Sequence, residues 1–301
     1  MNPVEVPFAF SLGDDSLIGI LHAAAPDARQ GVVMVVGGPQ YRVGGHRHYV
    51  KVARRLAAGG VPVLRYDYRG IGDSTGRFRG FENLDDDIRA GIDALVARVP
   101  TLQQIVLWGL CESASAIALY AHGDPRVAGA ILVNPYASTE GGRARTVLRH
   151  YYLTRLFDRD FWMRLLRGRV PIGSSLRSLA QAVSRAAVGS NRPAEIALDR
   201  DAVAAERTLQ IRPPDRDDPV PLPERMAREL EKFRGRLLFV LSGDDLTAAE
   251  FIAACKSRRW ADILSGATTD RIDIPDADHT FSRHIWLDRM VDETRRWLAS
   301  W

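Results

Sequence analysis

Cys111 lies where a run of apolar, strand-forming residues gives way to small residues that suit a helix. The segment Ile105–Ala116 reads IVLWGLCESASA, so Gly109 stands two positions before the cysteine and Ser113 two positions after it. A nucleophile held in a sharp turn between a strand and a helix needs small residues at both positions, because larger side chains would collide with the turn. The start of the helix would also favour the thiolate form of Cys111. The spacing therefore predicts a cysteine nucleophile.

Three alternatives accompany this prediction. A free cysteine at the end of a strand is often a small buried apolar residue. Ser113 and Ser115 follow Cys111 closely and also carry nucleophilic atoms. Neither serine stands two residues after a glycine in the expected turn, so we expect each to pack against the helix or to cap it.

A nucleophile of this kind needs a general base, and the base needs a carboxylate that orients it. The apolar run Leu237–Leu241 is followed by Ser-Gly-Asp-Asp, in which Asp245 is the first choice and Asp244 the alternative; either could instead cap a helix. His279 follows the last apolar run and is the best placed of the seven histidines. Each candidate comes at the end of an expected strand, which predicts a triad of Cys111, Asp245 and His279.

Two backbone N–H groups should stabilise the oxyanion that forms when the nucleophile attacks a carbonyl. One belongs to Glu112, the residue after the nucleophile. The other comes from the loop after Val32–Val36, which reads GGPQY. Pro39 has no N–H. Gly38 or Gln40 must therefore donate, and Gly38 is favoured because glycine tolerates strained loops.

The elements that position these residues alternate between strands and helices. The expected strands are Val4–Ser11, Leu17–His22, Val32–Val36, Val61–Tyr66, Ile105–Trp108, Ala128–Val133, Leu237–Leu241 and Asp270–Ile274. The expected helices are His48–Ala58, Leu84–Val99, Ser113–His122, Thr247–Lys256 and His284–Leu298. This order predicts an α/β fold with right-handed crossovers and a mostly parallel, doubly wound sheet.

The alternation stops after Asn134-Pro135 and resumes at Leu237. In between, the chain looks helical and irregular, and it holds twelve Arg against five Asp or Glu between Glu140 and Arg200. We expect a helical, Arg-rich cap at 137–230, inserted between two parts of the core at 1–136 and 231–301. A solvated helical face is the simplest reading of its charge, and attraction of an acidic substrate, a phosphate-bearing carrier or a membrane surface is the alternative.

The composition is that of an ordinary globular protein, with 301 residues, 46% hydrophobic and 26% charged. We find no apolar run long enough to span a bilayer, no secretory signal and no nucleic-acid-binding motif. The two cysteines, Cys111 and Cys255, are then expected to be free thiols in a reducing cytoplasm. Nothing in the sequence implies a metal or a redox cofactor, and the oligomeric state stays open.

Further motifs resemble those of known families. Asp67–Ser74 (DYRGIGDS) resembles the D-x-R-G-x-G-x-S turn of many α/β-hydrolases, in which we expect Asp67 and Arg69 to be structural. The chain more specifically resembles the exosortase A system-associated hydrolase 1 family. The matching segments are Val36–Gly44, Trp108–Cys111, Ser242–Glu250 and Ala277–Ser282. The chain departs at Glu112-Ser113, where Asp-Gly is expected.

The resemblance implies an α/β-hydrolase fold in a bacterial cytoplasmic protein linked to exopolysaccharide and protein-sorting gene clusters. With Cys111 as nucleophile, it favours an enzyme that acts on an ester or thioester through an acyl-cysteine. Acyl transfer from a carrier or CoA to an acceptor other than water is an alternative, since polyhydroxyalkanoate synthases and dienelactone hydrolases similarly place a cysteine in this turn. A non-catalytic binding protein of the same fold is another.

Overall fold

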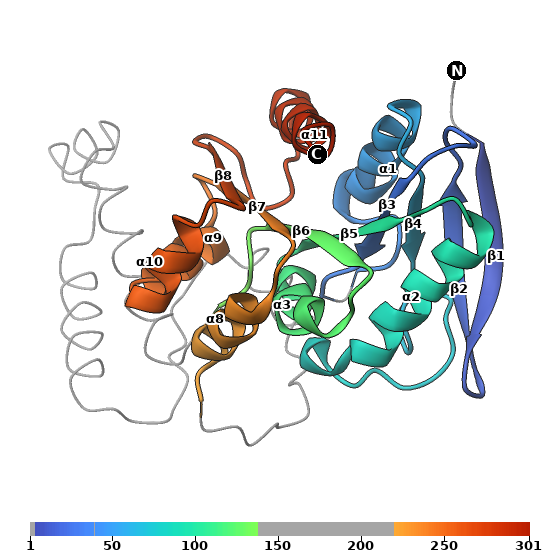
Figure 1. Ribbon diagram of the computed structural model, residues 1–301, viewed down its shortest axis with the longest axis horizontal. Coiled ribbons are helices and arrows are strands. Elements are labelled where there is room, and N and C mark those ends of the chain that lie inside the picture. Colours follow the sequence, from blue (N-terminus) through green and yellow to red (C-terminus); the bar gives the residue numbers. More distant parts are fainter. Residues whose placement is uncertain (1–3, 39, 138–219) are drawn as a thin grey trace, which may run out of the picture. The chain divides into compact units, whose positions relative to one another are not determined.

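A computed structural model describes residues 4–38, 40–137 and 220–301, which build one mixed sheet (Figure 1). The sheet has eight strands in the order β1-β2-β4-β3-β5-β6-β7-β8. The strands are β1 (Glu5–Leu12), β2 (Asp15–His22), β3 (Gln30–Val35), β4 (Val63–Tyr66), β5 (Gln104–Leu110), β6 (Val127–Val133), β7 (Arg236–Ser242) and β8 (Thr269–Ile274). β1, β2 and β4 pair antiparallel, and every later pair is parallel. The mostly parallel sheet of an α/β-hydrolase fold is confirmed.

The central strands are apolar along almost their whole length because helices cover both faces of the sheet. In β3, for example, Val32, Val33 and Val35 are all fully buried. Strands of this kind end together at one edge of a parallel sheet, so the loops that follow β3, β5, β6, β7 and β8 meet there. This edge is where the predicted site residues lie along the chain.

The helices form a layer on each side of the sheet (Figure 1). α1 (His48–Ala58) contacts α11 (His284–Leu298) on one face, and α3 (Glu112–Tyr120) contacts α8 (Leu222–Lys232) on the other. Two of these helices, α1 and α11, have the bounds that the sequence predicts. The other described helical segments are α2 (Asp85–Arg98), α9 (Leu246–Ala254), α10 (Arg258–Leu264), and the short 3-10 turns η1 (Gly45–Arg47), η2 (Phe81–Asn83) and η3 (Ala121–Gly123).

α8 corrects the predicted boundary between cap and core. From the sequence we expect the cap to extend to residue 230 and the segment up to Pro223 to be a loop. In the structure α8 begins at Leu222, and its apolar residues Met226, Ala227 and Leu230 are buried in the core with the sheet. A hydrophobic stripe at helical spacing is equally typical of a cap helix and of a core helix, so only the packing distinguishes them.

α10 was not predicted, because seven residues are too few for a clear helical period. It is held by Trp260, a fully buried residue whose indole N–H donates to the carbonyl oxygen of Pro223 at 3.1 Å. The Ser257 side chain caps the start of the helix. α10 therefore packs beside α8 as part of the core.

The chain divides into two units, residues 1–137 with 211–301 and residues 138–210. The predicted Arg-rich cap lies outside the described residues except for 137 and 220–230, so it stays a prediction. Among the described helices, none is both long and apolar enough to cross a membrane.

Candidate active site

Cys111 sits in a strained turn between β5 and α3. Its backbone has φ 63° and ψ −124°, a conformation that a residue with a side chain adopts only when its surroundings hold it there. Two glycines permit the close packing. A Cβ on Gly109 would lie 2.8 Å from the backbone nitrogen of Ala114, and a Cβ on Gly37 would lie 2.2 Å from the carbonyl oxygen of Leu110. The turn thus has the form expected of a nucleophile elbow.

Ser113 fits the elbow in the place where glycine is usual. The side chain is fully buried, and its Oγ accepts a hydrogen bond from the Leu110 N–H and donates one to the Leu110 carbonyl, both at 2.9 Å. Ser115 is also buried, and its hydroxyl donates to the carbonyl oxygen of Tyr136 at 2.5 Å. Both hydroxyls are engaged with the backbone, which leaves Cys111 as the better placed nucleophile.

His279 and Asp245 meet although 34 residues separate them in the chain. The Nδ1 atom of His279 lies 2.8 Å from Oδ2 of Asp245. The same carboxylate caps α9 by accepting from the N–H groups of Thr247 and Ala248, both at 3.1 Å. Asp245 is buried whereas the neighbouring Asp244 is exposed, so the structure brings Asp245 and not Asp244 to the histidine.

The side chain of His279 also hydrogen-bonds to Cys111. Burial lowers the pKa of His279, but the hydrogen bonds to Asp245 and Cys111 and the charges of these two groups outweigh burial and raise the pKa to about 10. The imidazolium form of His279 is therefore favoured at neutral pH. The three residues form a relay of carboxylate, imidazole and thiol.

Asn134, which the sequence analysis did not select, ties the loops of this relay together. It directly follows β6 and is fully buried. Its side chain donates to Ser242 Oγ at 2.9 Å and to the carbonyl oxygen of His279 at 3.1 Å, and it accepts from the Ser242 N–H at 2.8 Å. The signal that could have found it is a polar residue at the end of a buried parallel strand.

The loop after β3 lies beside the elbow. The Gly37 N–H donates to the hydroxyl of Tyr49 at 3.1 Å, and the Gly38 N–H donates to the carboxylate of Glu112. The side chain of Gln40 accepts from the Gly45 N–H at 3.2 Å. The two predicted sources of the second oxyanion N–H are Gly38 and Gln40, and both lie on this loop beside Cys111. Gly38 directly contacts Glu112, the residue after Cys111.

The turn at 67–74 holds this loop in place. Asp67 is fully buried and accepts from the backbone N–H of Arg42 at 2.6 Å and from its guanidinium group. Arg69 forms a buried pair with Asp87, with Nη2 at 2.7 Å from Oδ2. Both motif residues thus have structural partners, and Arg42 connects the turn to the loop that carries Gly38.

Two of the other described histidines, His48 and His22, are buried and held by structural contacts. His48 is buried, and its Nδ1 lies 2.8 Å from the carbonyl oxygen of Gly45; burial lowers its pKa to about 4. His22 is buried and accepts from Arg65 at 2.7 Å. His284 is exposed at the start of α11. His150 lies outside the described residues.

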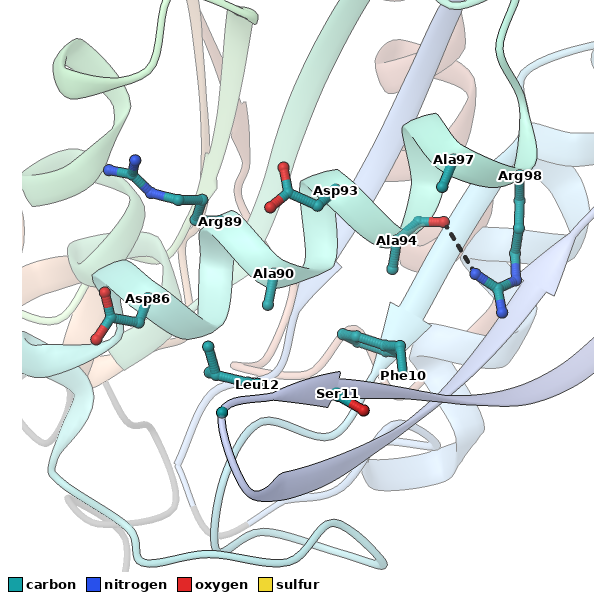
Figure 2. Close-up of a pocket in the computed structure, with 11 residues that line it drawn as sticks. Phe10, Ser11, Leu12, Asp86, Arg89, Ala90, Asp93, Ala94, Ala97 and Arg98 are labelled. Atoms are coloured by element: carbon teal, nitrogen blue, oxygen red, sulfur yellow. Dashed lines mark hydrogen bonds between the residues drawn. The ribbon is translucent and has the colours of Figure 1, made fainter.

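A shallow hollow elsewhere on the molecule is separate from this site. It lies between β1 and α2, and its lining includes Phe10, Leu12, Arg89 and Arg98 (Figure 2). None of the predicted site residues lines it. Within residues 4–38, 40–137 and 220–301, no group of three or more His, Cys, Asp or Glu side chains is arranged to hold a metal ion.

Comparison with known proteins agrees with the fold. The model of the family described as "Serine aminopeptidase, S33" matches residues 27–186, more than half of the chain. The chain belongs to this family. It is an α/β hydrolase by family and by fold. A search of curated proteins gave no significant match.

Several solved structures share the fold at low sequence identity. An esterase from Pyrococcus furiosus has a TM-score of 0.63 at 13% identity, covering 99% of this chain and 92% of the esterase. Est1E from Butyrivibrio proteoclasticus, solved with ferulic acid bound, has a TM-score of 0.59 at 16% identity, covering 97% and 98%. The α/β hydrolase GrgF from Penicillium sp. has a TM-score of 0.58 at 17% identity, covering 99% and 100%.

Proposed function

We propose that this chain is a cysteine-dependent α/β hydrolase that cleaves an ester or thioester through an acyl-cysteine intermediate. The observation that carries the proposal is the relay in which His279 is hydrogen-bonded to Asp245 at 2.8 Å and to the thiol of Cys111. A nucleophile, a base and an orienting carboxylate in hydrogen-bonding reach are the arrangement that acyl transfer requires. The esterases among the structural neighbours show the fold alone, and an ester substrate is compatible with them.

Acylation follows from the relay. In the proposed mechanism His279 carries, as its imidazolium, the proton that the Cys111 thiol gives up, and the thiolate attacks the substrate carbonyl, forming an S–C bond and a tetrahedral oxyanion. The N–H groups of Glu112 and of Gly38, or of Gln40, stabilise the oxyanion. When the oxyanion collapses, the bond to the leaving alkoxide or thiolate breaks, and His279 returns its proton to that group.

Deacylation repeats the same steps with water. His279 removes a proton from the water molecule, the resulting hydroxide attacks the acyl-cysteine carbonyl, and the Cys111 thiolate leaves. Asp245 stabilises the imidazolium in both halves of the reaction. The carboxylic acid is released and the free thiol is regenerated, so no oxidant, reductant or metal enters the balance.

Acyl transfer is the second candidate, and the cysteine itself favours it. An acyl-cysteine is a thioester, which amines, hydroxyl groups and thiols attack readily. A serine nucleophile would form an oxygen ester at this point instead. A cysteine at this position therefore suits an enzyme that passes its acyl group to an acceptor other than water.

Intact-mass measurement with p-nitrophenyl acetate tests the proposal. We expect the wild-type protein to release p-nitrophenol and to gain one acetyl group, and Cys111→Ala to do neither. A Cys111→Ser variant incubated with cell extract should trap the natural acyl group as a more stable ester. Adding an amine or a thiol then separates transfer from hydrolysis by the product that forms.

Cys255 provides the matched control. It is the other cysteine of the chain, and burial raises the pKa of its thiol well above the usual range. Iodoacetamide should therefore alkylate Cys111 much faster than Cys255, and Cys255→Ala should keep the esterase activity. If Cys111 reacts no faster than a free thiol and Cys111→Ala leaves turnover unchanged, the chain is better explained as a non-catalytic binding protein of this fold.

The narrower expectations remain part of the proposal. Kinship with the exosortase A system-associated hydrolase 1 family rests on the sequence segments around Gly38, Cys111, Asp245 and His279. A cytoplasmic location rests on the sequence alone. The acyl group and the acceptor are left to the trapping experiment.

A further inference from the structure

The side chain of Glu112 turns back toward the loop that should help to bind the oxyanion. The backbone N–H of Gly38 donates a hydrogen bond to its carboxylate, and a Cβ on Gly38 would lie 3.8 Å from Oε2. Tyr68 also contacts Gly38, and its hydroxyl donates to the Gly38 carbonyl oxygen at 3.4 Å. Burial and the nearby charge of Glu112 raise the pKa of Tyr68. Glu112 and Tyr68 therefore both contact Gly38.

This contact matters because Gly38 is the favoured second donor to the oxyanion. An N–H group that points at a carboxylate oxygen is not available to a substrate oxygen. A carboxylate oxygen and an oxyanion are both negatively charged acceptors, so they compete for the same donor. In the free enzyme the Glu112 carboxylate therefore occupies one of the two N–H donors of the oxyanion site.

The carboxylate of Glu112 is weakly held in this position. Burial raises the pKa of Glu112, and the hydrogen bond from Gly38 lowers it by less. Among the described residues, no Lys, Arg or His forms an ion pair with it. A buried carboxylate without a cation pays a desolvation cost, which favours its release when another acceptor takes the donor.

We propose that Glu112 is an internal competitor for the oxyanion site: its carboxylate holds the Gly38 N–H in the free enzyme, and a substrate reacts only after its carbonyl oxygen displaces that carboxylate. The proposal rests on the proposed function, since it concerns the same nucleophile. It makes Glu112 a residue that selects substrates by how well they replace a bound carboxylate. The resemblance leads one to expect Asp here, and the extra methylene of Glu112 lengthens the reach of its carboxylate.

Single-turnover acylation by p-nitrophenyl acetate measures the competition directly. If the site is open in about a tenth to a third of the molecules, Glu112→Ala should raise the acylation rate roughly three- to tenfold. Glu112→Gln should give a smaller increase, because its neutral amide oxygen can still accept from Gly38 but competes less strongly. The matched control is Glu231→Ala, which removes an exposed glutamate from α8 and should leave the rate unchanged.

Alkylation of Cys111 by iodoacetamide separates the two proposals, because alkylation needs the thiolate but no oxyanion site. We expect all Glu112 variants to be alkylated at the wild-type rate. If Cys111 in the wild-type protein is not reactive, the proposed function fails and the gain seen in Glu112→Ala should also be absent. If Cys111 is reactive but Glu112→Ala acylates at the wild-type rate or more slowly, Glu112 positions the loop and the competitor proposal is overturned.

The amide resonance of Gly38 gives a readout that does not depend on activity. A hydrogen bond to a carboxylate should shift its amide proton downfield in the wild-type protein, and Glu112→Gln should move it upfield. Glu112→Gln keeps the shape of the side chain, so it remains informative if Glu112→Ala does not fold. A Gly38 resonance that is identical in the wild-type protein and in Glu112→Gln would overturn the proposal.

Discussion

The hydroxyl of Ser113 binds both backbone groups of Leu110, with Oγ 2.9 Å from the nitrogen and 2.9 Å from the carbonyl oxygen. These two residues stand on either side of Cys111 and Glu112, so one side chain closes the turn that holds the nucleophile. A glycine at 113 would leave the Leu110 N–H without this partner. The departure from the usual elbow sequence is therefore accommodated by a hydrogen bond and does not open the turn.

Replacing Ser113 by alanine should destabilise the elbow. The variant leaves the buried Leu110 N–H without its acceptor, and a buried unsatisfied donor costs about 1–3 kcal/mol. Urea denaturation of Ser113→Ala should show this loss in the free energy of unfolding. Ser265→Ala is the matched control. Ser265 is exposed, and its hydroxyl donates to the carbonyl oxygen of Ala261 at 2.8 Å. Equal losses in the two variants would contradict the structural role of Ser113.

Replacing Asp245 by asparagine should abolish most of the activity while preserving the fold. Asparagine caps a helix about as well as aspartate, so α9 should keep a cap through the side-chain oxygen and the variant should fold. Its free energy of unfolding should fall, because His279 loses a partner that raises its pKa. The amide group of asparagine cannot stabilise an imidazolium at Nδ1. We expect turnover of p-nitrophenyl acetate to fall about 100- to 10,000-fold, the usual contribution of acid–base catalysis.

Asp244→Asn is the control for this experiment, because Asp244 is adjacent in sequence and exposed. It should keep wild-type turnover. If Asp244→Asn loses activity and Asp245→Asn does not, the carboxylate that orients His279 has been assigned to the wrong residue.

The raised pKa of His279 makes the stability of the fold depend on pH. In the folded protein its pKa is raised from 6.5 to about 10 by the hydrogen bonds and charges of Asp245 and Cys111, against the effect of burial. Because the folded state binds the proton more tightly, this group stabilises the fold fully below the unfolded pKa near 6.5 and progressively less as pH rises, with the contribution lost above about 10.

Titration of the His279 ring protons by NMR checks this prediction. We expect a midpoint near pH 10 in the wild-type protein. The midpoint should be lower in Asp245→Asn and in Cys111→Ala, because each variant removes one partner of the imidazolium. A wild-type midpoint near 6.5 would mean that the relay does not hold a proton on His279.

The parts of the site that sequence could predict are those set by chain order. Cys111, Asp245 and His279 each lie at or shortly after the end of a recognisable strand, and parallel strands end at one edge of the sheet, so their meeting could be foreseen. The choice between Asp245 and Asp244 could not, because it depends on which carboxylate caps α9 and is buried. α8 was misassigned for a similar reason, since its apolar stripe does not reveal which partner it packs against.

Contacts between residues from distant segments could not be predicted from the sequence. The bond between Gly38 and Glu112 joins a loop to the start of α3, 74 residues further along the chain, and neither residue type predicts the other. Asn134 bonds to Ser242 across 108 residues. Such contacts depend on the register of the sheet and on side-chain rotamers, which periodicity does not encode.

Asn134 offers a prediction about positioning that is independent of the chemistry of the relay. Its backbone has φ 42°, a left-handed conformation that asparagine tolerates better than alanine. Asn134→Ala removes the bonds to Ser242 and to the carbonyl of His279, and displacing a catalytic group by about 1 Å can cost as much as 100-fold in rate. We therefore expect kcat to fall about ten- to a hundredfold, while KM changes little because Asn134 lies behind the relay.

Backbone strain and lost hydrogen bonds can be told apart with a second variant. Asn134→Gly relieves the left-handed strain but restores none of the three side-chain hydrogen bonds. If the bonds position His279, Asn134→Gly should be as slow as Asn134→Ala, and the NMR titration midpoint of His279 should shift in both. Asn83→Ala is the control, because its side chain makes an exposed bond to the Arg79 carbonyl at 2.9 Å. Recovery of kcat in Asn134→Gly would instead assign the defect to strain, and Asn134 would then have no part in holding His279 against Asp245.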